Sequence, residues 1–340
     1  MDAGGGRYFR HIFCAIERRD ADGHTYNTQP MSWEDPRMSL RRLAAICALC
    51  TPLHAWACAC GCGVFEVGGS EMLPQGTGTQ LFYQFSYLDQ TDNWSGTSSA
   101  PATANDDQHI RTLYQSVGLR HMFGRDWGFS ISVPYDQRHF STIDDDVAVT
   151  TDHGQIGDIR LMGMYTGFSG DMSSGISFGL KLANGDWKVP GFDRDTQIGT
   201  GSTDLLLGGY HQFRIGGLGS DWSGFVQAIV DAPIVTQGGY RPGTEFNAGF
   251  GIYPTSWQLA PGVELTPMLQ ALGSRRSHDA GSNAGPDNTG YSRLLAAPGL
   301  ELRVKRLRVF ADIEAPLWQN VRGNQLIAPW QAKLTISLHL

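Results

Sequence analysis

The stretch that decides the fold is Trp-Gly-Phe-Ser-Ile-Ser-Val-Pro-Tyr at residues 127–135, in which large apolar side chains alternate with small or polar ones. Successive side chains of a β-strand point to opposite faces, so this period of two predicts a strand with one apolar face. The same alternation marks residues 159–167, 222–234 and 309–317, and the chain ends on Leu-Thr-Ile-Ser-Leu-His-Leu at 334–340. From Gly78 onward a helical period is nearly absent, which predicts an all-β protein.

Working outward from this stretch, we find twelve strand-like segments, at 79–89, 109–123, 127–139, 155–168, 174–184, 202–215, 221–234, 243–256, 261–274, 290–303, 305–316 and 327–338. Tight turns such as 124–126 alternate with longer Asp-, Asn-, Gly- and Thr-rich links at 90–108, 140–154, 185–201, 235–242, 275–289 and 317–326. Short turns at one end and long loops at the other are typical of outer-membrane barrels. We therefore expect an antiparallel transmembrane β-barrel of about 12 strands over 78–340, with a soluble β-sandwich as the alternative.

Two residue classes support the barrel. Six tryptophans fall at or near predicted strand ends, where interfacial girdles lie: Trp127, Trp187, Trp222, Trp257, Trp318 and Trp330. A charge that faces lipid near the bilayer midplane costs about 2–4 kcal/mol, so charges within strands should face the lumen. The predicted lumen-lining residues are Arg120, Asp158, Arg160, Asp204, Arg214, Asp231, Asp312 and Glu314. Both an open channel and a packed ionic plug fit this pattern.

The segment before the barrel has the pattern of an exported protein. Residues 38–57 contain Arg41 and Arg42, a short apolar stretch and an Ala-Trp-Ala site at 55–57, which together indicate a signal peptide. The polar residues 1–37 are then a leader that is either mis-annotated or disordered. The alternative for 43–56 is a buried hydrophobic helix.

Cysteine use divides the chain sharply, because all six cysteines precede Gly63. The segment 58–77 opens with Cys58, Cys60 and Cys62 in a Cys-x-Cys-x-Cys motif, whose soft thiolates are candidate ligands for Cu(I) or Zn(II). An exported chain also meets an oxidising compartment, so a disulfide between Cys58 and Cys62 is an alternative. A lipid on Cys58 is a third.

Composition and motifs argue against other functional classes. A net charge of −7 disfavours a nucleic-acid partner. The sequence has no G-x-S-x-G elbow, and its histidines are scattered, so we predict that the chain is not an enzyme and uses no cofactor. Gly199 and Gly201 precede a strand, not the helix that a phosphate loop requires. Two acidic groups are either solvated loops or Ca²⁺ ligands: Asp144, Asp145 and Asp146 with Asp152, and Asp193 with Asp195.

Several stretches together resemble a family of bacterial outer-membrane barrels labelled putative meta-pathway of phenol degradation. They are 127–135, 157–160, 179–182, 198–208 and the cysteine-rich start at 58–65. The resemblance covers most of the chain from Cys58 onward and nothing before Met38. It implies a Gram-negative outer-membrane protein with a transport role, and it supplies no catalytic residues.

These observations predict an outer-membrane channel or transporter for small solutes, with hydrophobic or aromatic compounds as the class that the family label implies. Its expected partners are outer-membrane lipid, lipopolysaccharide and a small-molecule solute. Two alternatives stand beside this function: a metal-handling protein that works through Cys58, Cys60 and Cys62, and a structural barrel that transports nothing.

Overall fold

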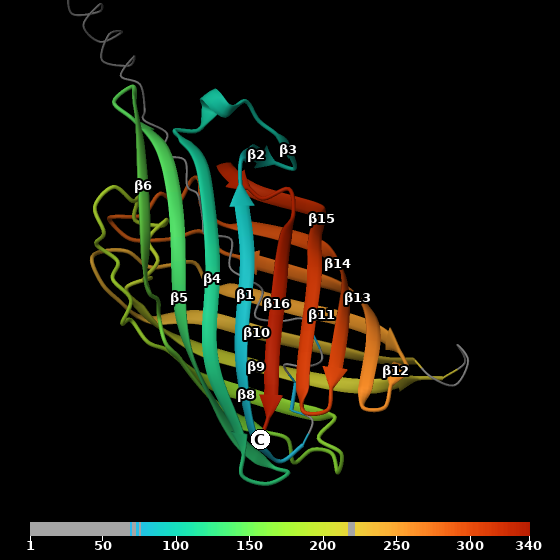
Figure 1. The fold of residues 1–340 in the computed structure, drawn as a ribbon. Coiled ribbons are helices and arrows are strands. Elements are labelled where there is room, and N and C mark those ends of the chain that lie inside the picture. Colours follow the sequence, from blue (N-terminus) through green and yellow to red (C-terminus); the bar gives the residue numbers. More distant parts are fainter. Residues whose placement is uncertain (1–68, 70–72, 75, 217–221) are drawn as a thin grey trace, which may run out of the picture. The chain divides into compact units, whose positions relative to one another are not determined.

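The computed structural model describes residues 69, 73–74, 76–216 and 222–340, and these form one antiparallel sheet. Twelve strands make the wall of a closed barrel (Figure 1). They are β1 (Gly78–Gln90), β4 (Asp107–Met122), β5 (Trp127–Asp144), β7 (Arg160–Tyr165), β8 (Ser174–Lys181), β9 (Ser202–Ile215), β10 (Trp222–Thr236), β11 (Glu245–Pro254), β13 (Val263–Arg276), β14 (Tyr291–Val304), β15 (Leu307–Ile327) and β16 (Gln331–His339). The predicted twelve-stranded antiparallel barrel is confirmed. No helix in this part of the chain is long and apolar enough to cross a membrane.

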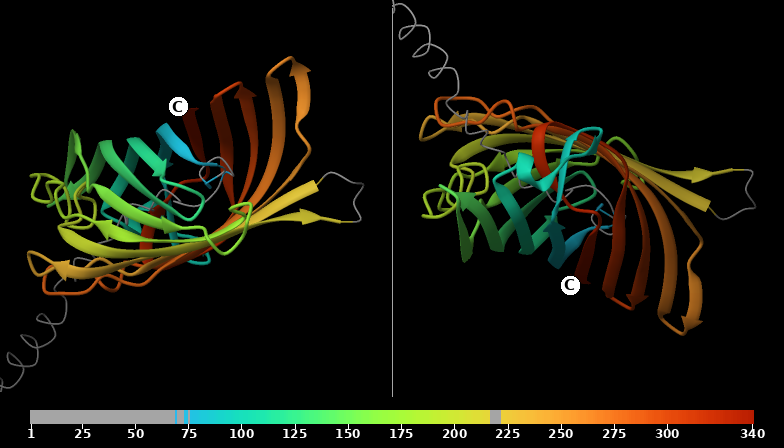
Figure 2. Two further views of the ribbon diagram at one scale, coloured as in Figure 1. Left: turned by 90° about the horizontal axis from the view of Figure 1, so that it is seen from below. Right: turned by 90° about the horizontal axis from the view of Figure 1, so that it is seen from above.

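The barrel closes where its first and last strands meet. Strand β1 pairs with β4 from Gly78↔Met122 to Gln90↔Ile110, and on its other edge with β16 from Gln80↔His339 to Leu88↔Gln331. Figure 2 shows β1 beside β16 next to the C-terminus. Every wall strand therefore has two neighbours, which removes the exposed edges that an open sheet would leave.

Connections are sorted by end, as predicted. Turns at the C-terminal end of the barrel include 123–126 and 305–306, whereas 182–201, 237–244 and 277–290 lie at the opposite end. Two further segments at this far end are strands where the sequence predicted loops. Residues 140–154 hold the end of β5 and most of β6 (Val147–Ile156), which are joined by Asp145 and Asp146, both at positive φ. Such a two-residue turn matches the strand twist and tolerates Asp, so the acidic run is a hairpin tip.

The predicted link at 317–326 is also wrong. Strand β15 continues through it to Ile327, because β2 (Asp92–Gly96) supplies a new partner there, with Ile327↔Asp92 and Leu326↔Asn93. Strand β3 (Ser98–Ser99) folds back on β2, a 3₁₀ turn follows at Ala102–Ala104, and β12 (Trp257–Ala260) extends the sheet beside β13. The wall is thus taller on the side of β15 than local sequence suggested.

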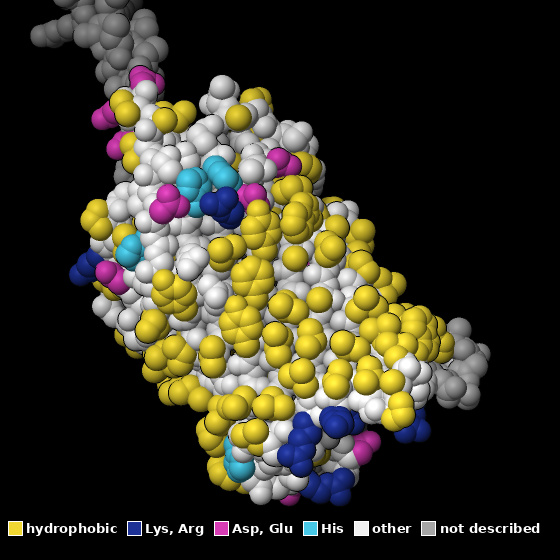
Figure 3. Space-filling model, viewed as in Figure 1, with side chains coloured by type: hydrophobic (Ala, Val, Ile, Leu, Met, Phe, Trp, Pro, Cys, Tyr) yellow, Lys and Arg dark blue, Asp and Glu magenta, His cyan; other side chains and the backbone are white. Residues whose placement is uncertain are grey.

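The two faces of the wall differ as the period of two requires. The outer face is apolar over a broad band (Figure 3), and Val117 there is 62% exposed. The inner face carries most of the buried polar and charged groups, among them Arg120, Asp204 and Glu314. A protein with this arrangement has its buried polar groups inside and its apolar surface outside.

Candidate transport lumen

One cavity of about 390 Å³ lies inside the barrel, on the side of β4, β5 and β7–β11. Five of the eight predicted lumen-lining residues lie on it: Arg120, Asp158, Arg160, Asp204 and Asp231. Asp158 lies in the link between β6 and β7, where a strand was expected, and still points inward. The size is within the range of ordinary small-molecule sites, which span about 300–1,000 Å³.

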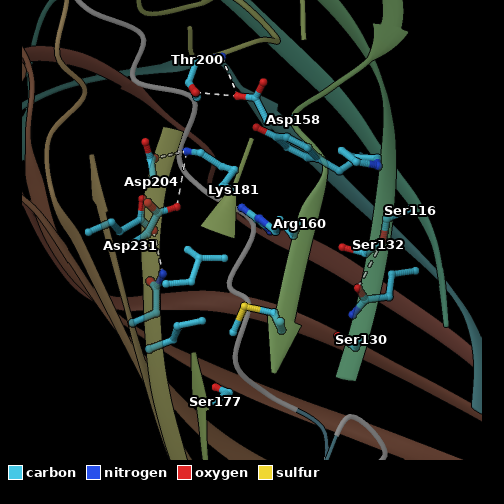
Figure 4. A pocket seen from close by; sticks show the side chains of 18 of the residues that line it. Ser116, Ser130, Ser132, Asp158, Arg160, Ser177, Lys181, Thr200, Asp204 and Asp231 are labelled. Atoms are coloured by element: carbon cyan, nitrogen blue, oxygen red, sulfur yellow. Dashed lines mark hydrogen bonds and ion pairs between the residues drawn. The ribbon is translucent and has the colours of Figure 1, made fainter. Parts of the chain in front are cut away.

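A buried ion-pair cluster forms one wall of this cavity (Figure 4). Lys181 on β8 pairs with Asp204 on β9 and, at 3.4 Å between Nζ and Oδ2, with Asp231 on β10. The register places Lys181 opposite Asp204 across the β8–β9 pair, so the sheet itself aligns them. Sequence reasoning named both acids and missed the lysine, although its alternation with Leu180 and Leu182 was readable.

Serine hydroxyls form the facing wall. Ser130 and Ser132 on β5 and Ser116 on β4 line the cavity together, and Arg160 extends between them and Lys181 (Figure 4). Arg120 donates from Nη1 to Gln80 Oε1 at 3.1 Å. Apolar side chains complete the lining, including Phe82, Met162, Leu206 and Tyr210. The cavity therefore offers charge, hydroxyl and apolar surface to one solute.

The loop 182–201 is tied into the lumen by Asp158 and Arg138. Asp158 accepts from Gly185 N and Thr200 N, each at 2.9 Å, and Arg138 donates to the carbonyl oxygens of Thr196 and Gln197. Arg138 lies on β5 and was not singled out from sequence. Trp187, expected in an interfacial girdle, belongs to this loop, where the Arg194 guanidinium lies 4.7 Å from its ring centroid.

Electrostatics in this loop depend on three acidic segments that converge. Burial, followed by the carboxylates of Asp195, Asp144 and Asp106, raises the pKa of Asp193 to about 6. Within the described residues, however, His, Cys, Asp and Glu side chains form no group of three or more that could hold a metal ion. The convergence makes the loop sensitive to protonation.

The described residues before β1 contact the interior side of the wall. Gly69 N donates to Gln270 Oε1 at 2.7 Å, and Gln270 donates to Asp312 Oδ2 at 3.0 Å. Leu73 packs in a buried cluster with Phe225, Met268 and Phe310. Leu73 and Pro74 also line the main cavity, so this segment narrows the lumen.

The remaining predicted residues are placed differently. Asp312 and Glu314 are buried on β15 and do not line the main cavity; Glu314 pairs with Lys333 at 3.1 Å and accepts from Gln331. Arg214 lies near the end of β9, is exposed, and is likewise outside the cavity lining. Cys58, Cys60 and Cys62 lie outside the described residues, as do the predicted leader and signal segments.

Comparison with known proteins gives the fold. No protein-family model and no curated protein matches the chain. Among solved structures, the COG4313 outer membrane channel from Pseudomonas putida F1 is similar with a TM-score of 0.58 at 12% identity, over 81% of this chain and 100% of that one. The β domain of the Bordetella autotransporter BrkA (14% identity, TM-score 0.45) covers 78% of this chain and 100% of its own. The CymD monoaromatic hydrocarbon channel (7%, TM-score 0.37) covers 78% and 89%.

This chain has the fold of an outer-membrane β-barrel. At 12% identity the likeness to the Pseudomonas channel extends to the course of the strands and not to particular side chains. The lining of the lumen is therefore this chain's own, and its function has to be argued from the residues described above.

Proposed function

We propose that this chain is an outer-membrane channel that passes small solutes through the lumen beside Lys181, Asp204 and Asp231. The observation that carries the proposal is a cavity enclosed by a closed barrel whose outer face is apolar. Backbone groups in hydrocarbon must all be paired, and a closed barrel pairs them. An apolar exterior around a polar interior is the arrangement that allows passage of polar groups across lipid.

The lining supports an amphipathic solute with one polar group. Arg160, Lys181 and the serine hydroxyls of β4 and β5 can hydrogen-bond a hydroxyl or carboxylate, while Phe82 and Leu206 offer apolar contact for a ring or short chain. The resemblance to the family labelled for phenol degradation points to the same class. No covalent chemistry is needed for such passage.

Ion currents through the purified protein in planar bilayers test this function. Wild-type protein should give discrete conductance steps. Ser132→Trp places an indole in the cavity and should reduce the step size several-fold, whereas Val133→Trp, one residue along on the outer face, should leave it unchanged. Uptake of phenol into liposomes that contain each variant should follow the same order. Wild-type protein that inserts and conducts nothing would favour a structural barrel.

The metal-handling alternative rests on cysteines outside the described residues. It predicts Cu(I) or Zn(II) in purified protein at about one ion per chain, and its loss in a variant with serine at 58, 60 and 62. Metal analysis of these two proteins measures this directly, and conductance of the serine variant shows whether the two functions are separate.

A further inference from the structure

A polar cluster lies on the outer face of the barrel, at the end that carries the long loops. The register sets Asp89 of β1, Arg111 of β4, His139 of β5 and Asp152 of β6 in one row across four strands. Figure 3 shows histidine, arginine and acidic side chains grouped above the apolar band. These residues are far apart in sequence, so the histidines looked scattered before the strands were paired.

His139 is held as a general base would be. Its Nδ1 lies 2.8 Å from Asp152 Oδ1, and the His139 side chain is 23% exposed. A carboxylate at Nδ1 fixes the tautomer in which Nδ1 carries the proton and Nε2 can accept one. The neighbouring His109 contacts Asp89 Oδ1 through Nε2 at 2.6 Å, and its ring centroid is 5.1 Å from that of His139.

Ser141 supplies a hydroxyl beside this base. It follows His139 by two residues on β5, so both side chains lie on the same face of the strand. Across the β4–β5 pair Ser141 is opposite His109. Its Oγ accepts from Thr150 Oγ1 at 3.4 Å, which leaves the proton of Ser141 available for donation. Attack by this hydroxyl would require a rotation about χ1 that turns it along the strand toward His139.

The position of the cluster along the barrel axis indicates which bonds of a surrounding lipid would lie beside it. The outer face of β1 carries Leu81, Tyr83, Phe85 and Tyr87, and changes to a carboxylate at the next outward position, Asp89. Tyr87 donates to Asp89 Oδ2 at 2.9 Å, which is where an interfacial tyrosine belongs. In a bilayer, this boundary between hydrocarbon and headgroup is where the ester bonds of glycerolipids lie.

We propose that Ser141, His139 and Asp152 form a hydrolytic site for acyl esters of membrane lipid. Ser141 Oγ attacks the ester carbonyl carbon while His139 Nε2 takes the hydroxyl proton, and Arg111, next in the row, stabilises the oxyanion. The C–O bond to the glycerol oxygen breaks, and His139 returns the proton to that oxygen. Water then attacks the acyl-serine, His139 again transfers the proton, and the products are a fatty acid, a lysolipid and free Ser141.

A second serine–histidine pair provides a matched control. Ser174 Oγ and His211 Nδ1 lie 2.8 Å apart on the outer face at the opposite end of the barrel, and the described contacts give His211 no carboxylate partner. Without a carboxylate the imidazole lacks both its orienting group and the charge that stabilises imidazolium. The proposal therefore assigns reactivity to Ser141 and none to Ser174.

The test uses the full-length protein in detergent micelles with a fluorophosphonate probe, which labels serine only when a base activates it. Wild type should be labelled at Ser141, as identified by mass spectrometry, and Ser174→Ala should label equally. Ser141→Ala should abolish labelling, and His139→Ala and Asp152→Asn should slow it on the order of a hundredfold or more. An unlabelled wild type, or labelling that persists in Ser141→Ala, overturns the proposal.

The substrate class is tested with phosphatidylethanolamine in mixed micelles. Fatty-acid release should be lost in Ser141→Ala and retained in Ser174→Ala. The choice of a lipid ester rests on the membrane placement proposed above, whereas labelling of Ser141 does not. Conductance of Ser141→Ala should equal that of wild type, so failure of the channel and failure of the hydrolytic site give different results.

Discussion

Two regions of the barrel interior each contain a buried lysine that pairs with a carboxylate, but only one of these pairs borders the main cavity. Lys181 and Lys333 are both buried, at 7% and 6% exposure, and both pair with carboxylates of a neighbouring strand. Lys181 borders the main cavity beside Arg160, whereas Lys333 and its partner Glu314 lie outside the cavity lining. Part of the interior is thus a cavity and part is packed. The sequence left an open channel and an ionic plug as alternatives, and the two ion pairs provide positions at which they can be tested.

The largest effect should come from breaking the packed pair. Lys333→Met leaves Glu314 as a buried charge without its lysine, which costs about 3–5 kcal/mol in the free energy of unfolding. Lys181→Met should cost less, because water in the cavity can solvate Asp204 and Asp231. Both losses of unfolding free energy can be measured by urea titration. The folded fraction at each urea concentration is read from the shift in gel migration that heating causes in a folded barrel. The double variant Lys333→Met/Glu314→Leu should recover most of the loss, and equal losses in the two single variants would contradict the distinction.

The next largest effect should come from placing a charge on the outer face of the barrel, beside Arg160 or beside Asp312. Leu161 beside Arg160 is 41% exposed, and Ile313 beside Asp312 is 57% exposed. Replacing either by Arg should cost about 2–4 kcal/mol if the site lies near the bilayer midplane, because the charge then faces lipid. The yield of folded barrel in liposomes gives the measurement. Unimpaired folding of both variants would place these side chains outside the membrane.

A smaller difference should appear in the rate of chemical labelling of the inner face. A cysteine at position 160 borders the cavity and should react with a bulky water-soluble maleimide. A cysteine at 312 should not, because Gln270 lies against Asp312 and is itself bonded by Gly69 N. Cysteines at 161 and 313 should be protected in liposomes. Equal reactivity at 160 and 312 would show that the described segment before β1 does not shield β15.

The smallest effect should be the response of the loop 182–201 to pH. The pKa of Asp193, about 6, is above its ordinary value of 3.8, so folding favours the protonated carboxyl. The loop should be most stable below pH 3.8 and should lose stability as pH rises to about 6 and above. Hydrogen-exchange protection, corrected for the intrinsic rate, should be higher at pH 5 than at pH 8. Asp193→Asn should remove this difference, and an unchanged pH response in that variant would assign it to another group.

The sequence by itself determined the strands. Alternation at 127–135 and along the other segments is a local signal, since apolar and polar side chains must take opposite faces wherever a strand borders lipid. It placed ten of the twelve wall strands to within about five residues at each end. The segment predicted for β15 ended eleven residues before Ile327, and β7 lies inside a longer predicted segment. It also identified five charged residues that line the cavity, but it missed Lys181 and Arg138. Where it failed, at β6 and at the extension of β15, the pairing partner was a distant segment or the turn was made of Asp145 and Asp146, which also suit a solvated loop.

Only the tertiary structure decided which side chains meet. Strand register brings Lys181 into contact with Asp231 and His109 into contact with His139. Register depends on pairing between segments that lie 30 to 50 residues apart in the sequence. The tertiary structure also divided the interior, because Leu73 and Gly69 enter it by contacts with β10, β13 and β15 that no local pattern encodes. The alternation of side chains determines the face on which each residue lies, and the pairing of strands in the closed barrel determines its neighbours on that face.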